Sequence, residues 1–127
     1  MRDLVQHVPA FGLNEVSLLK VGRHFRLSPE TKLVVGRDEG ENRRIQLLAA
    51  GEDLLFEAKD VSGPISLLRC SGEAGEGAAE VAASITARYS DAEGPEVVVA
   101  FGTMAEGMTH KLRVPPLGEA VLDALRI

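Results

Sequence analysis

The sequence is poor in cysteine and aromatic residues, and it lacks a long apolar run. Cys70 is the single cysteine, which excludes an internal disulfide and a zinc site built from several cysteines. With no tryptophan and 4% aromatic residues, the core must consist mainly of leucine, valine, isoleucine and alanine. No apolar run reaches the roughly 18 residues that a membrane helix needs. Residues 1–12 show no apolar segment typical of a secretion signal, so we expect a cytoplasmic protein without a membrane partner.

A catalytic or metal-binding pattern is also missing from the sequence. His7, His24 and His110 are far apart and do not have the spacing of metal ligands. No serine lies in a Gly-x-Ser-x-Gly turn, and Cys70 has no histidine nearby in the sequence. The sequence therefore predicts no catalytic residue, no metal site and no cofactor, and it favours a protein that is not an enzyme.

The charge of the chain is acidic overall but unevenly distributed. The net charge is −5, which by itself argues against a nucleic-acid-binding protein. Residues 1–70 carry ten basic and ten acidic side chains, whereas residues 71–127 carry four and nine. Residues 20–37 contain five basic residues and only one acidic residue, Glu30. This pattern is compatible with a local basic surface on an acidic body.

Periodicity and turn residues predict one α+β domain over residues 1–127. Its sheet should be largely antiparallel or mixed, with two to three helices packed on it. An arm at 1–15 precedes strands at 25–27, 32–37, 53–60, 65–69, 96–102 and 110–114 and helices at about 39–50, 77–90 and 117–127. Polar and apolar residues alternate in His110–Val114, which is typical of an edge strand or of a strand with one solvated face. In the last helix, Leu117, Val121, Leu122 and Leu125 should point inward.

Two segments place arginine directly after glycine, at Gly22-Arg23 and at Gly36-Arg37. Glycine permits close approach of a ligand to the backbone, and arginine can donate two hydrogen bonds to one phosphate. With His24 and Arg26, these residues could form a phosphate-binding patch on which Phe25 or His24 stacks on a base. The alternative interpretation is that the arginines are simply solvated and that Phe25 lies in the core.

A third candidate lies where the helix at 39–50 begins. Asp38 is suited to cap this helix, and Asn42 is unusual there unless its amide binds backbone or a ligand. Arg43 and Arg44 could bind an anion near the free N–H groups of the first turn. An ion pair within the helix is an equally good explanation, because acidic residues share this turn. Farther on, Asp60 fits a structural role in a turn, and the role of Lys59 stays open.

These segments resemble the RNA-binding domain of the NFACT proteins, which act in ribosome quality control. The resemblance covers about residues 18–114 and is carried by KLVVGRDEGEN, by DLLFEAKDVSGPISLLR and by an alanine-rich helix ending in ARYSDA. LLKVGRHFRLS is similar to a variant of the domain that accompanies PP-loop ATPases of the tRNA 2-thiouridylase type. Gly36, Arg37 and Asn42 match one family motif, and Lys59, Asp60 and Gly63 match another. Asp38 and Pro64-Ile65 depart from the asparagine and the Ser-His pair expected at those places.

The resemblance implies a non-catalytic RNA-binding module, for tRNA and linked to tRNA thiolation or translation quality control. The alternative is an interaction module that docks onto a PP-loop ATPase and contacts RNA only in that complex. The sequence leaves self-association open. The predicted RNA-binding residues are Arg23, His24, Arg26, Gly36, Arg37, Asn42, Arg43, Arg44, Lys59, Asp60 and Gly63.

Overall fold

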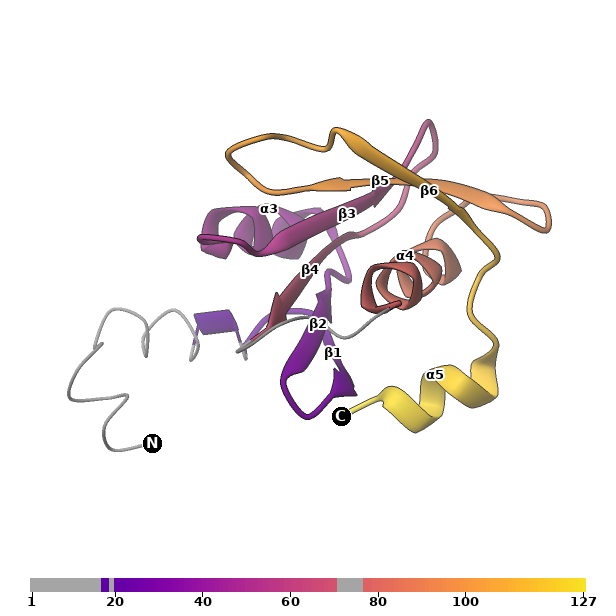
Figure 1. Ribbon diagram of the computed structural model, residues 1–127, viewed down its shortest axis with the longest axis horizontal. Helices are drawn as coiled ribbons and strands as arrows, with labels where there is room; N and C mark the ends of the chain where they lie inside the picture. The colour runs from indigo at the N-terminus through magenta and orange to yellow at the C-terminus, as the bar shows by residue number, and fades with distance from the viewer. Residues whose placement is uncertain (1–16, 19, 71–76) are drawn as a thin grey trace.

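A six-stranded antiparallel sheet with a helix on each face forms the centre of the fold (Figure 1). The computed structural model describes residues 17, 18, 20–70 and 77–127, so the predicted arm and most of the predicted loop at 71–77 lie outside the described residues. The strands are β1 (Arg23–Ser28), β2 (Thr31–Val35), β3 (Leu54–Ala58), β4 (Ile65–Cys70), β5 (Val97–Gly102) and β6 (His110–Val114). The helices are α3 (Glu39–Leu48), α4 (Ala78–Arg88) and α5 (Glu119–Leu125). No helix in the described ranges is long and apolar enough to cross a membrane.

The strands are arranged in the order β1-β2-β4-β3-β5-β6, and every neighbouring pair is antiparallel. This confirms the α+β prediction and decides between an antiparallel and a mixed sheet. It also shows that His110–Val114 is an edge strand, one of the two predicted alternatives, because β6 pairs only with β5 among the described strands. At the opposite edge, Arg126 forms an isolated bridge to Phe25, and the Ile127 N–H donates to the carbonyl of His24.

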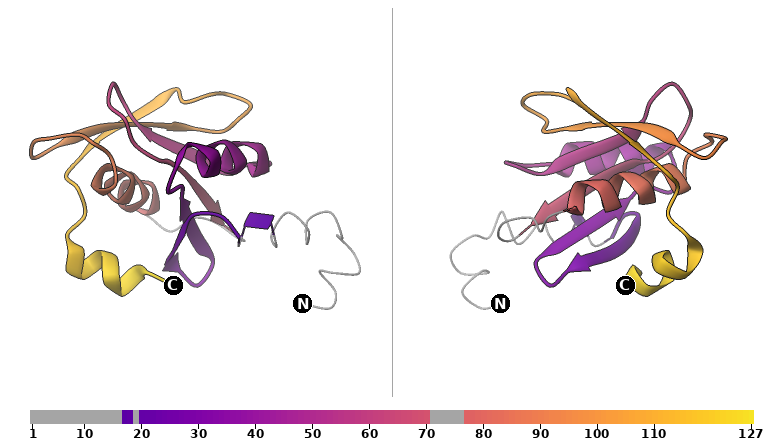
Figure 2. Two further views of the ribbon diagram at one scale, coloured as in Figure 1. Left: turned by 180° about the vertical axis from the view of Figure 1, so that it is seen from behind. Right: turned by 45° about the vertical axis from the view of Figure 1, so that its right-hand side comes forward.

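Alternation along the strands gives the sheet two apolar faces, and a different helix packs on each of them (Figure 2). Phe25, Phe56 and Val99 belong to the cluster under α4, while Leu67 belongs to the smaller cluster under α3. Ile45 is the buried residue of α3, as its helical spacing predicts. The prediction that Val121 points inward is wrong, since this residue is 52% exposed. Leu122 is the buried residue of α5, because this helix packs on the sheet through one narrow side.

Candidate functional site

A cleft of about 930 Å³ lies at the end of the sheet where α3 begins and α4 ends. Its lining comes from four separate parts of the chain: the start of β1, the β2–α3 connection with α3, the end of β3 with the β3–β4 connection, and the end of α4. The lining residues are Arg23, Gly36, Arg37, Asp38, Glu39, Asn42, Arg43, Gln46, Glu57, Val61, Ser62, Gly63, Pro64, Ile65 and Tyr89. The chain topology therefore brings together segments that are up to 66 residues apart, from Arg23 to Tyr89.

Gly36 and Asn42 form one wall of the cleft by joining the β2–α3 connection to the start of β4. The side-chain Oδ1 of Asn42 accepts a hydrogen bond from the N–H of Ile65 at 3.0 Å, and the N–H of Gly36 donates to the carbonyl of Ile65 at 3.0 Å. A Cβ atom on residue 36 would overlap Asn42 Oδ1. The glycine is therefore required by close packing, and the unusual helical asparagine satisfies a backbone donor.

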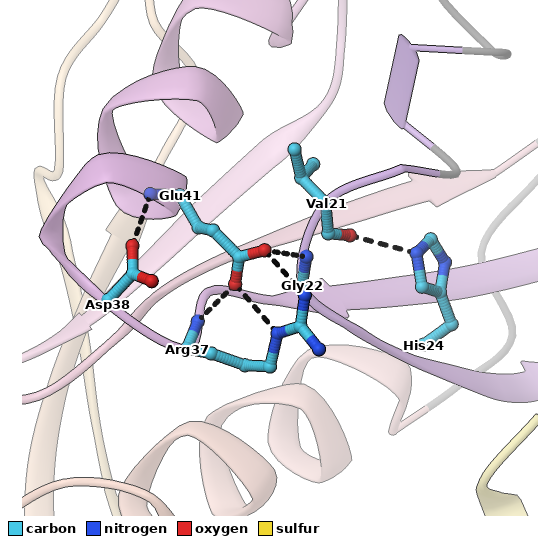
Figure 3. A network of polar contacts seen from close by, with 6 residues as sticks. All are labelled: Val21, Gly22, His24, Arg37, Asp38 and Glu41. Atoms are coloured by element: carbon cyan, nitrogen blue, oxygen red, sulfur yellow. Dashed lines mark hydrogen bonds and ion pairs between the residues drawn. The ribbon is translucent and has the colours of Figure 1, made fainter.

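Glu41 holds the side chain of Arg37, the residue that follows Gly36 in this wall (Figure 3). Its carboxylate accepts from Arg37 Nε and Nη2 at 2.9 and 2.8 Å, from the Arg37 N–H at 2.9 Å and from the Gly22 N–H at 3.0 Å. These bonds, with the bonds to the Arg37 side chain contributing most, lower the pKa of Glu41 to about 2. Asp38 caps α3, as predicted, by accepting from the Glu41 N–H at 2.8 Å.

The opposite wall combines the β3–β4 connection with the end of α4. A Cβ atom on Gly63 would lie 2.8 Å from the Cβ of Ser90, so the turn packs directly on the helix end. The Asp91 N–H donates to the carbonyl of Ser62 at 2.7 Å. Tyr89 lies beside this contact, and the guanidinium carbon of Arg23 is 4.6 Å from the centre of its ring. The Tyr89 hydroxyl accepts from Arg126 Nη2 at 3.2 Å, so one arginine contacts the ring and another contacts its hydroxyl.

The structure brings only part of the predicted set into the cleft. Six predicted residues line it: Arg23, Gly36, Arg37, Asn42, Arg43 and Gly63. Five predicted residues do not line it: His24, Arg26, Arg44, Lys59 and Asp60. Lys59 and Asp60 line a neighbouring depression that shares Val61 with the cleft. Asp60 adopts a left-handed φ of 62°, which suits the tight β3–β4 turn.

Alternation along β1 explains why its candidate residues separate. Arg23 lies on the same side of the sheet as Phe25, whereas His24 and Arg26 lie on the other side. Phe25 is fully buried, so the prediction that it could stack on a base is wrong and the core interpretation is right. His24 is half-buried, and its Nε2 lies 2.9 Å from the carbonyl of Val21. Arg26 donates from Nη1 to the carbonyl of Pro29 at 3.1 Å.

The structure decides the role of Asn42 at the start of α3, and among the described residues it shows no ion pair within the helix that would explain Arg43 and Arg44, so their anion binding stays a prediction. The ion pair there joins Arg37 to Glu41 at 2.8 Å, and within the described residues neither Arg43 nor Arg44 forms one. Asn42 binds backbone, as one of its two predicted roles requires. Sequence reasoning missed Tyr89 as a site residue, although it stands in the ARYSDA segment that carried the resemblance. It also missed Gln46, Ser62 and Glu57, for which the sequence offers no signal.

The lining of the cleft is polar, and its charges balance. Arg23, Arg37 and Arg43 face three carboxylates, those of Asp38, Glu39 and Glu57. In the ranges that the structure describes, no group of three or more His, Cys, Asp or Glu side chains could hold a metal ion. The polar lining with its three arginines is suited to binding a polar ligand.

Residues 22–125 match the NFACT protein RNA binding domain. The chain belongs to this family. It is therefore an RNA-binding module of a non-catalytic family, which confirms the family that the motifs indicated. The structure is similar to that of the C-terminal part of the fibronectin/fibrinogen-binding protein from Streptococcus suis, with a TM-score of 0.73 and 21% identity. That alignment covers 84% of this chain and 49% of the other, so the chain spans about half of that structure. The likeness concerns the fold, and a comparison with curated proteins gave no match.

Proposed function

We propose that the chain binds tRNA by contacting the sugar-phosphate backbone in the cleft, with Arg23, Arg37 and Arg43 as the phosphate-binding side chains. The observation that carries this proposal is the meeting of two family motifs in one cleft. Gly36, Arg37 and Asn42 come from the first motif, and Gly63 comes from the second, 21 residues after Asn42. Three arginines beside them supply the charge-assisted donors that recognise phosphate.

The geometry of Arg37 favours binding of a phosphate without prior rearrangement. A guanidinium has five N–H donors, of which Glu41 engages one on Nε and one on Nη2. Three donors therefore remain, and the Arg37 side chain is 53% exposed. Because Glu41 already fixes the side chain, little rotamer entropy is lost when a phosphate binds. Arg23 is fixed in a comparable way by its contact with Tyr89.

The acidic residues of the cleft shape the expected salt dependence. With three carboxylates in the lining, the net field at the cleft is small, so binding should depend on short-range contacts. Each phosphate contact lowers the slope of log K against log salt by about 0.7 to 0.9. Three arginine contacts thus predict a slope of about −2 to −3, well below that of strongly basic proteins.

A role beside a PP-loop ATPase of the tRNA 2-thiouridylase type is the finer part of the proposal. It rests on the resemblance of LLKVGRHFRLS to the domain variant that accompanies such enzymes. Arg23 belongs to this segment and lines the cleft. Such a chain would hold tRNA for an enzyme that supplies the chemistry.

Binding of fluorescently labelled bulk tRNA, measured by anisotropy across a salt series, tests the proposal. The R23Q/R37Q/R43Q variant should bind at least about tenfold more weakly. The magnitude of its slope of log K against log salt should be reduced by about 2. The matched control is R26Q/R44Q/R88Q, which removes the same charge from three arginines outside the cleft. Equal weakening by both variants would show that net charge, not the cleft, governs binding. Absence of wild-type binding at low salt would refute autonomous tRNA binding.

A second candidate function is docking onto a protein partner, with RNA contact only in the complex. The observation that favours it is the edge strand β6, which has no strand partner on its outer side among the described strands. An open edge can accept an added strand from another chain. If tRNA binds only when a PP-loop ATPase is present, this second function replaces the first.

A further inference from the structure

A basic patch lies outside the cleft, on the face of β3, β5 and β6 that looks toward the α3 side of the sheet. Register places its residues in two rows across these strands. Glu57 pairs with Ala100, which pairs with Lys111. In the next row the Lys59 N–H donates to the carbonyl of Val98 at 2.9 Å, and Val98 pairs with Arg113. Val98 and Ala100 of β5 therefore lie between Lys59, which directly follows β3, and the two cations of β6. We call Lys59, Lys111 and Arg113 the sheet patch.

The sheet patch is open to solvent. All three of its side chains are exposed, and Val98 and Ala100 between them are only half-buried. The apolar cluster under α3 involves β2, β3 and β4 and no residue of β5 or β6 as a buried member. Among the described elements, α3 packs mainly on β4, and neither β5 nor β6 is among the strands with which it makes extensive contact.

In the part of the chain that the structure describes, the cations of the sheet patch lack the ion-pair partners that usually neutralise a surface charge. Among the described residues none of the three forms an ion pair with a carboxylate. Lys59 lies directly beside Lys111, and this contact and its charge lower the pKa of Lys111, while Asp60 opposes the shift. Two adjacent ammonium groups repel each other, and an anion placed between them would relieve that repulsion.

Protection of an exposed edge explains only part of this arrangement. Charged side chains on an edge strand prevent unwanted strand pairing, which would account for Lys111 and Arg113 on β6. It does not account for Lys59, which follows β3, an interior strand of the sheet. All three cations converge on one face, and this convergence points to a ligand.

The sheet patch borders the cleft. Glu57 lines the cleft and occupies the same cross-strand row as Lys111. Neighbouring strands lie about 4.8 Å apart, so the backbones of Glu57 and Lys111 are separated by about 10 Å. Val61 lines both the cleft and the depression that contains Lys59. A polynucleotide backbone leaving the cleft could reach the sheet patch within a few nucleotides.

We propose that Lys59, Lys111 and Arg113 form a second phosphate-binding site, which holds the backbone of the same RNA strand where it leaves the cleft. This inference rests on the proposed function, because it extends the path of the RNA bound there. Charge complementarity identifies the occupant: the patch presents cations to a ligand that carries one negative charge per nucleotide. The carboxylate of Glu57 between the two sites would favour a path in which phosphates lie on either side of it.

The test compares tRNA binding of wild type, the cleft variant R23Q/R37Q/R43Q and a patch variant, K111Q/R113Q, in the anisotropy salt series. The patch variant should bind about five- to tenfold more weakly at low salt. The magnitude of its slope of log K against log salt should be reduced by about 1 to 2. The charge-conserving variant K111R/R113K should bind like wild type. The matched control K20Q/R88Q removes two positive charges from exposed residues outside both sites.

The outcomes separate the two proposals. If K111Q/R113Q binds like wild type while the cleft variant is impaired, the patch proposal is wrong and the proposed function stands. Increased self-association of K111Q/R113Q with unchanged tRNA affinity would assign the charges to edge protection and overturn the proposal. Equal weakening by K20Q/R88Q would also overturn it, because the effect would then follow net charge. Failure of wild type to bind tRNA would overturn both proposals.

Discussion

Glu41 is the single side chain whose removal should affect the cleft most. Its carboxylate accepts four hydrogen bonds that link α3, the residue before β1 and Arg37. Glu41→Gln leaves one acceptor oxygen and turns an amide N–H₂ toward existing donors, so at least two of the bonds are lost. Hydrogen bonds to a charged group contribute about 1.5 to 3 kcal/mol each. The Arg37 side chain is half exposed, so solvent screens its bonds to Glu41 and reduces their contribution. We therefore expect Glu41→Gln to lower the free energy of unfolding by about 2 kcal/mol.

The pH dependence of this loss gives a sharper test than its size. The pKa of Glu41 is about 2 in the folded protein against an ordinary value of 4.5. A carboxyl whose folded pKa is depressed contributes stability that is fully present above 4.5 and is lost as pH falls toward 2. Protonated Glu41 resembles glutamine, so the difference between wild type and Glu41→Gln should shrink over this range.

Urea unfolding at several pH values between 7 and 2.5 measures this difference directly. Other carboxyl groups titrate equally in both proteins, so their contribution cancels in the subtraction. Glu39→Gln is the matched control, because Glu39 lies in the same helical turn and its side chain forms no hydrogen bond or ion pair within the described residues. A Glu41→Gln difference that stays constant down to pH 2.5 would refute the reasoning.

Two further predictions concern the walls of the cleft and His24. Gly36→Ala should lower the free energy of unfolding by about 2 kcal/mol, because the added Cβ overlaps Asn42 Oδ1. Adding Asn42→Ala to this variant should recover part of the loss. If the losses of the two single variants simply add in urea unfolding, the clash is not the cause. Burial, followed by the charge of Lys32, lowers the pKa of His24 below 6.5, so the unfolded chain binds the proton more readily. Wild-type stability should therefore fall relative to His24→Gln as pH drops below about 6.5, and parallel pH profiles of the two proteins would show that His24 is not the cause.

Much of the fold could be predicted from local patterns in the sequence. Alternation predicted β6 with its observed bounds, as an edge strand or a strand with one solvated face, because a half-solvated strand shows a period of two. The strand order decided that it lies at an edge. Asp38 correctly predicted the start of α3, because the side chain of a helix-capping residue accepts from an N–H only three residues farther along the chain. Val121 was predicted to point inward and is exposed. Helical periodicity shows which side of a helix is apolar but not how much of that side is buried, and α5 contacts the sheet through too narrow a strip to bury Val121.

The sequence by itself determined the elements, the family motifs and the absence of a cysteine framework, because these depend on interactions within a few residues. Only the tertiary structure decided which arginines share a cleft. Strand alternation sends Arg23 and Arg26 to opposite faces, and the bond between Asn42 and Ile65 spans 23 residues. The contact between Lys59 and Lys111 likewise requires the strand order β3-β5-β6. Strand order and helix placement follow from burial of apolar faces across the whole chain, which no local pattern encodes.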